Sequence, residues 1–306
     1  AEIIRKATPA AKFDMASNPE FLREGSAIGD FMRPDRVVIG CETEEARAVM
    51  RQLYRPLFLI ETPILFTSLE TSELIKYSAN AFLALKISFI NQISDLCDQV
   101  GANVADVSRG IGLDGRIGSK FLHPGPGYGG SCFPKDTLAL VKTARDAHAP
   151  ISLVEATVSY NDARKVQMAD RISTALNGDV KGKTVAVLGL TFKPNTDDMR
   201  DAPSLVIIPE LLKRGAKIQA HDPVGTEEAR KHMPDIDYCE DPYQTMVGAD
   251  ALVIITEWNS YRALDLAKVK KLLKAPIVVD LRNIYRPDEM AQFGFNYTSL
   301  GRPRTI

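Results

Sequence analysis

The order of apolar and polar residues changes along the chain and divides it into three parts. In the first part, 1–66, short apolar runs alternate with polar loops. "RVVIG" (36–40) is typical of a strand, residues 43–57 of a helix with Thr43 as its N-cap, and "LFLIETPILFT" (57–67) of extended chain. We therefore interpret residues 1–66 as a remnant of an N-terminal α/β domain.

The second part contains the longest helical pattern, "TSLETSELIKYSANAFLALKISFINQISDLCDQVGA". Thr67 and Glu70 have the spacing of a capping box, and Gly101 is typical of a helix C-terminus. Apolar residues cover much of the circumference of this predicted 69–100 helix, so it must be buried on several sides. A helix of roughly 30 residues spans about 45 Å. We predict a central helical domain over 67–181 that packs against a second copy to form a homodimer.

In the third part, continuous apolar runs alternate with helical segments. "TVAVLGL", "KIQAHD", "DALVIITEW" and "PIVVDL" are typical of strands buried on both faces of a sheet. Such alternation favours parallel strands joined by right-handed crossovers. Residues 182–306 are therefore predicted to form a doubly wound, Rossmann-like domain, and the chain as a whole to be an α/β protein.

The composition is that of a globular protein. The 306 residues suggest about two domains, with 45% apolar and 25% charged residues and a net charge of −1. This charge argues against binding to nucleic acid or to a membrane surface, and no apolar run is long enough to span a membrane. The four cysteines lack the spacing of metal ligands, so we predict no metal site. They also suggest free thiols in a reducing compartment rather than a disulfide framework, so we predict a cytoplasmic location. Because the first residue is Ala1, we expect the chain to begin inside a longer protein.

The stretch "GPGYGGSCFPKDT" (125–137) combines glycines, which allow a loop to wrap closely around a ligand, with a cysteine. Pro134 suits the first turn of a helix, so Cys132 is predicted to lie just before a helix N-terminus. The helix dipole and Lys135 would favour the thiolate. On these residues alone, a nucleophile and a buried structural thiol remain equally open.

Three pairs of polar residues are spaced four apart: Glu20 and Glu24, Lys76 and Asn80, and Cys132 and Asp136. In a helix this spacing places both side chains on one face. Together they supply the groups needed for acid–base and covalent catalysis. In the C-terminal domain, Lys193 and Arg200 would face the phosphates of a nucleotide, although a solvated surface loop is the simpler interpretation.

Four stretches in order resemble the motifs of the nucleotide-sugar dehydrogenases, the UDP-glucose/GDP-mannose dehydrogenase family. They are "NPEFLREGSAIGDFMRPDRVVIG", "ELIKYSANAFLALKISFINQI", "DGRIGSKFLHPGPGYGGSCFPKDT" and "GLTFKPNTDDMRDAPS". The resemblance covers essentially the whole chain and is strongest to members that act on UDP-glucose. It implies an NAD-dependent enzyme that oxidises C6 of the sugar to a carboxylate in two steps.

The resemblance implies a role for each matching catalytic residue. Cys132 matches the nucleophile that forms a thiohemiacetal and then a thioester. Lys76 and Asn80 match the groups that stabilise the oxyanion at C6, Asp136 the carboxylate that orients Lys76 and water, and Glu24 the residue that assists proton transfer.

The resemblance also implies ligand-binding residues. Those for the UDP-sugar are Glu20, Phe21, Leu22, Arg23, Arg116, Phe121, Tyr128, Gly129, Lys193 and Arg282, with Arg116 reaching into the partner subunit. Those for the cofactor are Glu24, Lys135 and Arg200.

One departure from the family affects the cofactor. The chain has no G-x-G-x-x-G directly after a first strand, so we expect the N-terminal NAD-binding Rossmann domain to be missing, or to be a separate polypeptide. Three alternatives stay open: a GDP-mannose-type dehydrogenase, a UDP-sugar-binding and dimerisation module without turnover, and a thiol hydrolase, which is the weakest because no histidine is near Cys132 in sequence.

Overall fold

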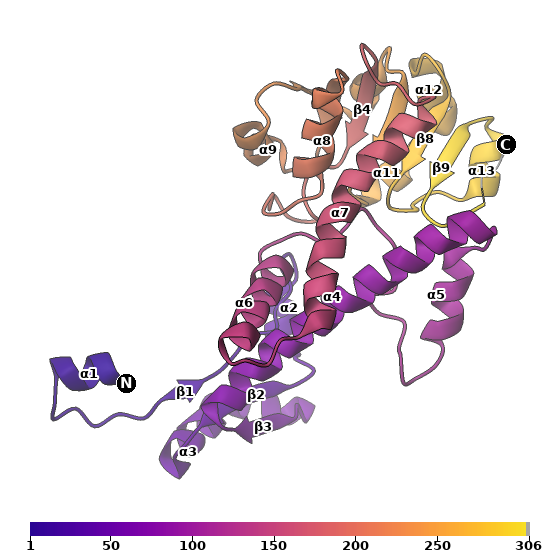
Figure 1. Ribbon diagram of the computed structural model, residues 1–306. Coiled ribbons are helices and arrows are strands. Elements are labelled where there is room, and N and C mark those ends of the chain that lie inside the picture. The colour runs from indigo at the N-terminus through magenta and orange to yellow at the C-terminus, as the bar shows by residue number, and fades with distance from the viewer. Residues whose placement is uncertain (304–306) are drawn as a thin grey trace. The chain divides into compact units, whose positions relative to one another are not determined.

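The computed structural model describes residues 1–303, apart from the side chains of residues 58–60, and contains two β-sheets (Figure 1). The last three residues of the predicted 182–306 domain lie outside the described part of the chain. The chain divides into two compact units, Ala1–Asn80 and Ala81–Ile306, and the boundary falls within the sequence of the longest helix. The finer division at 66/67 and 181/182 stays a prediction.

The N-terminal unit is built on a three-stranded sheet with the strand order β1-β2-β3. β2 (Val37–Cys41) and β3 (Ile64–Thr67) are parallel and are joined by α3 (Glu44–Leu53), while β1 (Ala16–Ser17) pairs with β2 in the antiparallel direction. A small core holds α3 against β2; its buried members are Val37, Ile39, Cys41, Ala46 and Leu57. The short helices α1 (Glu2–Ala7) and α2 (Ala27–Met32) contain no buried residue.

Two local predictions in this unit have different outcomes. Thr43 is the N-cap of α3 as predicted, because its Oγ1 accepts a hydrogen bond of 3.1 Å from the N–H of Ala46. The prediction of extended chain over 57–67 is wrong in its first part, where the 3₁₀ helix η1 (Arg55–Ile60) lies. Pro56 explains the difference, because its fixed φ suits the first turn of a helix.

The predicted long helix is confirmed as α4 (Leu69–Val100), which has 32 residues. Its N-terminus is capped by Ser68 rather than by Thr67, since Ser68 Oγ accepts a hydrogen bond from the N–H of Thr71. At its C-terminus Gly101 has the predicted left-handed conformation, with φ of 72°. The N–H of Ala102 donates to the carbonyl of Cys97, which completes a Schellman motif.

Three further helices form the helical part of the larger unit: α5 (Val104–Gly112), α6 (Cys132–Asp146) and α7 (Ser152–Ala175). α6 packs against the first half of α7. The second half of α7 belongs to the core of the sheet domain, where Met168, Ala169 and Ile172 are buried. Because α7 is a single helix, it connects the loop region around Cys132 rigidly to the sheet (Figure 1).

The C-terminal sheet has the strand order β6-β5-β4-β7-β8-β9, and all neighbouring strands are parallel. Its strands are β4 (Thr184–Leu188), β5 (Lys217–His221), β6 (Asp237–Tyr238), β7 (Ala251–Ile254), β8 (Ile277–Asp280) and β9 (Asn296–Ser299). The order reverses between β4 and β7, which is the switch point where doubly wound domains bind ligands. The predicted α/β fold class, with its doubly wound C-terminal domain, is confirmed.

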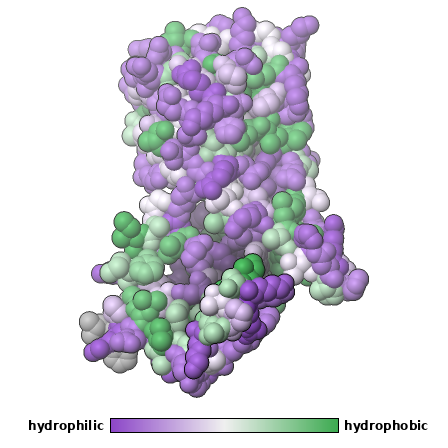
Figure 2. Space-filling model, turned by 90° about the vertical axis from the view of Figure 1, so that its left-hand side faces the viewer, coloured by the Kyte–Doolittle hydropathy of each residue, from purple (hydrophilic) through white to green (hydrophobic). Residues whose placement is uncertain are grey.

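Helices cover both faces of this sheet, as the apolar strand patterns require. α7, α8 (Ser204–Lys213) and α9 (Thr226–His232) contribute to the core on one face. The core on the other face includes residues of α10 (Pro242–Met246), α11 (Asn259–Arg262), α12 (Leu266–Leu272) and α13 (Pro287–Gln292). Polar side chains predominate over the upper part of the surface in Figure 2, where this domain lies. No helix within residues 1–303 has the length and apolar character needed to cross a membrane.

The sheet core generates a first prediction. Leu188 on β4 is fully buried, so Leu188→Ala should lower the free energy of unfolding by about 2–5 kcal/mol, through lost burial and the cavity it leaves. Urea unfolding followed by circular dichroism measures this change. Leu153→Ala is the matched control, because 72% of that side chain is exposed and the loss should be within about 0.5 kcal/mol. Equal losses in the two variants would contradict the described core.

Candidate active site

Cys132 is the first residue of α6, one position further into the helix than the sequence predicts. Its side chain is partly buried, and its Sγ lies 3.7 Å from Ser131 Oγ. Pro134 lies in the same first turn. Because the first N–H groups of a helix have no intrahelical acceptor, negative charge that develops next to Cys132 is stabilised there.

Asp136 follows Cys132 by one turn on the same face of α6, and only 2% of its side chain is exposed. Lys135 Nζ lies 3.2 Å from Asp136 Oδ1, while most of the Lys135 side chain remains exposed. A buried carboxylate with a neighbouring ammonium therefore lies beside the thiol.

The glycine-rich loop before Cys132 is held by side chains of α4 and α7. Asn91 Oδ1 accepts a hydrogen bond of 2.8 Å from Gly125 N, and Arg164 Nε donates one of 2.6 Å to Gly125 O. Asn161 binds both backbone groups of Tyr128, accepting from N at 2.8 Å and donating to O at 3.1 Å. The loop is therefore fixed in shape before any ligand binds.

The glycines of this loop are required for close packing within the protein. A Cβ on Gly129 would lie 2.3 Å from the carbonyl oxygen of Asp201, and one on Gly130 would lie 2.7 Å from the ring of Phe192. Gly130 N also donates to Arg200 O at 2.7 Å. The sequence suggested that these glycines wrap around a ligand, but the structure uses them to join the cysteine loop to the loop that follows β4. Although 125–130 spells G-x-G-x-x-G, it follows no strand and is not a dinucleotide-binding turn.

The aromatic residues predicted for the substrate surround Phe133 on α6. Its ring centroid is 6.1 Å from that of Phe121 and 5.9 Å from that of Tyr128. Burial raises the pKa of Tyr128 to about 12. The phenol is therefore protonated near neutral pH and can donate a hydrogen bond.

The predicted cationic residues of the larger unit have different surroundings. Lys193 Nζ lies 5.2 Å above the ring of Phe192, and Arg282 Nη2 donates to Phe192 O at 3.1 Å, so both belong to one region at the carboxyl end of the sheet. Arg200 forms a two-pronged ion pair with Asp198. Arg116 makes a similar pair with Asp114 and has a highly exposed side chain.

In the N-terminal unit, Lys76 contacts Glu20. Lys76 Nζ donates to the backbone oxygen of Glu20 at 2.5 Å and lies 3.1 Å from Glu20 Oε1, and only 14% of the Lys76 side chain is exposed. Asn80, one turn further along α4, is buried. The structure thus brings together the predicted ammonium and the first residue of "EFLREG".

Further contacts hold the rest of "EFLREG". Glu20 Oε2 accepts a hydrogen bond from Leu22 N, and Arg23 is paired with Asp30. The ring of Phe21 lies under both Arg36 and Lys76, while Glu24 is half-buried.

The sequence reasoning missed the polar residues of α7. Asn161, Arg164 and Lys165 are all buried, and Lys165 Nζ donates to Asp201 O at 3.1 Å. Burial lowers the pKa of Lys165, against the opposing effect of Asp201 and Asp162. The only sequence signal was a cluster of polar residues, "YNDARK", inside an otherwise core-forming helix.

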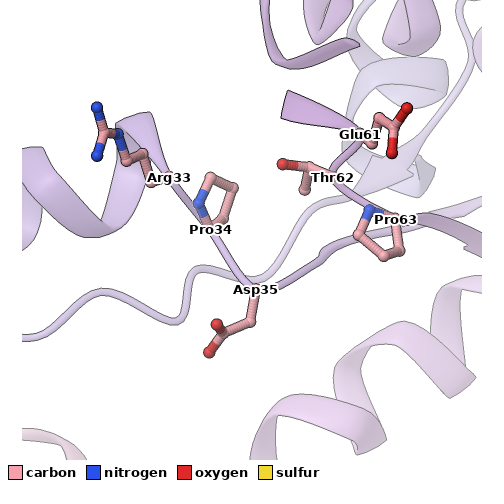
Figure 3. Close-up of a pocket in the computed structure, with 6 residues that line it drawn as sticks. All are labelled: Arg33, Pro34, Asp35, Glu61, Thr62 and Pro63. Atoms are coloured by element: carbon pink, nitrogen blue, oxygen red, sulfur yellow. The ribbon is translucent and has the colours of Figure 1, made fainter. Parts of the chain in front are cut away.

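The parallel β2-α3-β3 unit is of the kind that builds dinucleotide-binding domains, but its first turn is not a phosphate site. Glu44 and Glu45 lie in the first turn of α3, and Thr43 already caps it, so the charge there would repel a pyrophosphate. The N-terminus of α3 therefore does not form a cradle for the phosphates of NAD. In this unit a surface pocket is lined by the segments before β2 and before β3, Arg33–Asp35 and Glu61–Pro63 (Figure 3). It contains none of the predicted site residues.

Comparison with known proteins identifies all three parts of the chain. Residues 1–58, 70–163 and 186–287 match the NAD binding, central and UDP binding domains of the UDP-glucose/GDP-mannose dehydrogenase family. The chain is 61% identical over 303 residues to the UDP-glucose 6-dehydrogenase of Rhizobium meliloti, covering 98% of this chain and 69% of that protein. It is 48% identical to UDP-glucose 6-dehydrogenase TuaD of Bacillus subtilis, covering 98% of this chain and 65% of that protein.

Among solved structures, a UDP-glucose dehydrogenase from the hyperthermophilic archaeon Pyrobaculum islandicum has a similar fold. The TM-score is 0.87 at 36% identity, over 97% of this chain and 66% of that one. The chain thus spans about two thirds of the length of these relatives.

One prediction is corrected by the comparison. The NAD-binding domain was expected to be missing, but residues 1–58 match it. The expectation took the G-x-G-x-x-G turn as the mark of this domain, whereas the match includes β2 and α3, which carry no such turn. With matches to all three domains and to close relatives, the chain belongs to the UDP-glucose/GDP-mannose dehydrogenase family.

Proposed function

We propose that this chain is the UDP-sugar-binding and thiol-bearing part of a UDP-glucose 6-dehydrogenase, which converts the C6 hydroxyl of UDP-glucose to the carboxylate of UDP-glucuronate. The observation that carries this proposal is the position of Cys132 and buried Asp136 on the first turns of α6, directly after a loop packed against the UDP-binding domain. The high identity to enzymes of that name supports it. Two molecules of NAD⁺ would each accept one of the two hydrides that the oxidation of an alcohol to an acid releases.

In this proposal, the chain itself supplies the thiol that reacts at C6 of the sugar. Cys132 Sγ adds to the C6 aldehyde, so that a C–S bond forms, the C=O π electrons move to oxygen, and the oxygen takes a proton. After the second oxidation the carbon is a thioester. Water adds to it and the C–S bond breaks, which releases the acid and returns the proton to sulfur.

Other residues assist these steps in our proposal. Lys76 and Asn80 stabilise negative charge on the C6 oxygen, Asp136 orients Lys76 and water, and Glu24 assists proton transfer. The donors at the start of α6 favour the same charge. Residues 20–23, Phe121, Tyr128, Gly129, Lys193 and Arg282 bind the UDP-sugar, Arg116 reaches the partner's site, and Lys135 and Arg200 lie near the cofactor.

A GDP-mannose-type activity and a binding module without turnover are the alternatives. The identity to UDP-glucose enzymes favours the first proposal over GDP-mannose. An absorbance assay for NADH with each sugar nucleotide separates the three. We further propose a cytoplasmic location and three domains, 1–66, 67–181 and 182–306.

The thiol mechanism predicts the effect of a conservative substitution. Cys132→Ser should lower the rate of acid formation by at least about 10³-fold, because a hydroxyl is a far poorer nucleophile near neutral pH. NADH formed per UDP-glucose, measured in the complete enzyme, provides the readout. Cys239→Ser, at a half-buried thiol in the C-terminal domain, should behave as the native enzyme. Normal turnover by Cys132→Ser would exclude Cys132 from the mechanism.

A homodimer is proposed from the surface of α4. Phe82, Phe89 and Leu96 repeat every seven residues along this helix and are each about half exposed in the single chain. Such a stripe on a long helix suits packing against a second copy.

Phe89→Glu should convert the dimer to a monomer, because a charge would be buried in the interface. Light scattering after size exclusion measures the mass. Val224→Glu, which places the same charge on a half-exposed residue after β5, should remain dimeric. A monomeric native chain at micromolar concentration, or a dimeric Phe89→Glu variant, would sink the proposal.

A further inference from the structure

Of the four central strands of the C-terminal sheet, β5, β4, β7 and β8, three are closely followed by or end on an acidic residue: Asp222 after β5, Glu257 after β7, and Asp280 at the end of β8. Doubly wound domains bind ligands at this edge, and they commonly use an acid at a strand end to bind the hydroxyls of a ribose. The hydrogen bonds that each acid already makes decide which one is available for a ligand.

Asp222 and Asp280 are fully used within the protein. Asp222 accepts hydrogen bonds from the backbone N–H groups of Leu190, Thr191, Val224 and Gly225, and from the side chains of Thr191 and Trp258. Asp280 accepts from the N–H groups of Arg282, Ile284 and Tyr285 and from the hydroxyl of Tyr297. Both residues are buried, and they fix the turns after their strands.

Glu257 differs from both. Its Oε2 is buried and accepts no hydrogen bond from any residue in 1–303, although it lies 3.0 Å from Arg282 Nε. The single hydrogen on that Nε is directed to Ile255 O at 2.7 Å. The contact with Arg282 is therefore an ion pair without a hydrogen bond, which holds the carboxylate in place through its buried oxygen. Since 30% of the Glu257 side chain is exposed and its other oxygen, Oε1, accepts no hydrogen bond within residues 1–303, a ligand can reach Oε1 while Oε2 stays beside Arg282.

Arg282 places this carboxylate at the switch point. Its guanidinium binds the loop after β4 through Phe192 O and the segment after β7 through Ile255 O. Its Nη1 lies beside Gly125, since a Cβ on that glycine would be 3.0 Å away. Glu257 and Arg282 thus form a pair of opposite charge between the two strands where the sheet order reverses, next to the glycine-rich loop.

We propose that Glu257 binds the ribose hydroxyls of the UDP moiety, with Arg282 beside it directed to the diphosphate. This inference rests on the proposed UDP-sugar substrate. A carboxylate repels phosphate and attracts hydroxyl donors, and the lone pairs of its accessible oxygen can accept from the hydroxyls of a ribose. Glu257 would thereby make the domain selective for ribonucleotides over deoxyribonucleotides.

The test compares UDP with 2′-deoxy-UDP by titration calorimetry on the full chain. The native protein should bind UDP roughly tenfold more tightly, as expected for a hydrogen bond to a charged group. In Glu257→Ala the ratio of the two dissociation constants should fall close to one. Glu289→Ala, which removes an exposed glutamate on α13, should keep the native ratio. Circular dichroism checks that each variant is folded.

Every outcome of this comparison bears on the proposal. An unchanged ratio in Glu257→Ala overturns it, because another group of the protein then recognises the 2′ hydroxyl. A native ratio near one overturns it as well. If Glu257→Ala binds neither ligand measurably, Glu257→Gln, which keeps the shape and one acceptor oxygen, must show a reduced ratio. A native chain that binds no UDP contradicts the proposed function itself, whereas UDP binding without discrimination contradicts only the role of Glu257.

Discussion

The candidate site depends on a buried guanidinium. Arg164 is fully buried on α7, where its Nη1 lies 2.9 Å from both carboxylate oxygens of Asp95 on α4 and its Nε binds the carbonyl of Gly125. A buried cation is stable only if it is paired and hydrogen-bonded, so these partners must stay in place together. Through this one group, two long helices and the glycine-rich loop have fixed positions within the larger unit.

The fixed loop explains how the proposed nucleophile, Cys132, is held in place without a ligand. Asn91 and Asn161 complete the bonds to the loop backbone, and the glycines that follow pack against Phe192 and Asp201. The segment that carries Lys193 is therefore joined directly to the segment that ends at Cys132. In the proposed function, one loop binds the nucleotide and the other carries the chemistry at the sugar, so a single rigid arrangement would place C6 against the thiol.

The sequence was sufficient for the features that depend on local pattern. The apolar runs of β4, β5, β7 and β8, the length of α4 and the position of Cys132 at a helix start all follow from periodicity and capping. Partners in space do not follow from it. The residues of "YNDARK" were missed because a helical pattern shows which face is buried, but not that Asn161 and Arg164 meet a loop more than thirty residues away. The sequence also did not show why Gly129 and Gly130 are needed, because they pack against the loop after β4.

The central claim is that Cys132 forms a covalent bond to C6. The most direct measurement is the ¹³C spectrum of the C6 aldehyde of UDP-glucose, labelled at C6, in the presence of the chain and without cofactor. The account predicts a resonance of a tetrahedral carbon bonded to sulfur with the native chain and with Cys239→Ser, and its loss with Cys132→Ser. The same resonance in Cys132→Ser, or its absence in the native chain despite bound aldehyde, would contradict the account.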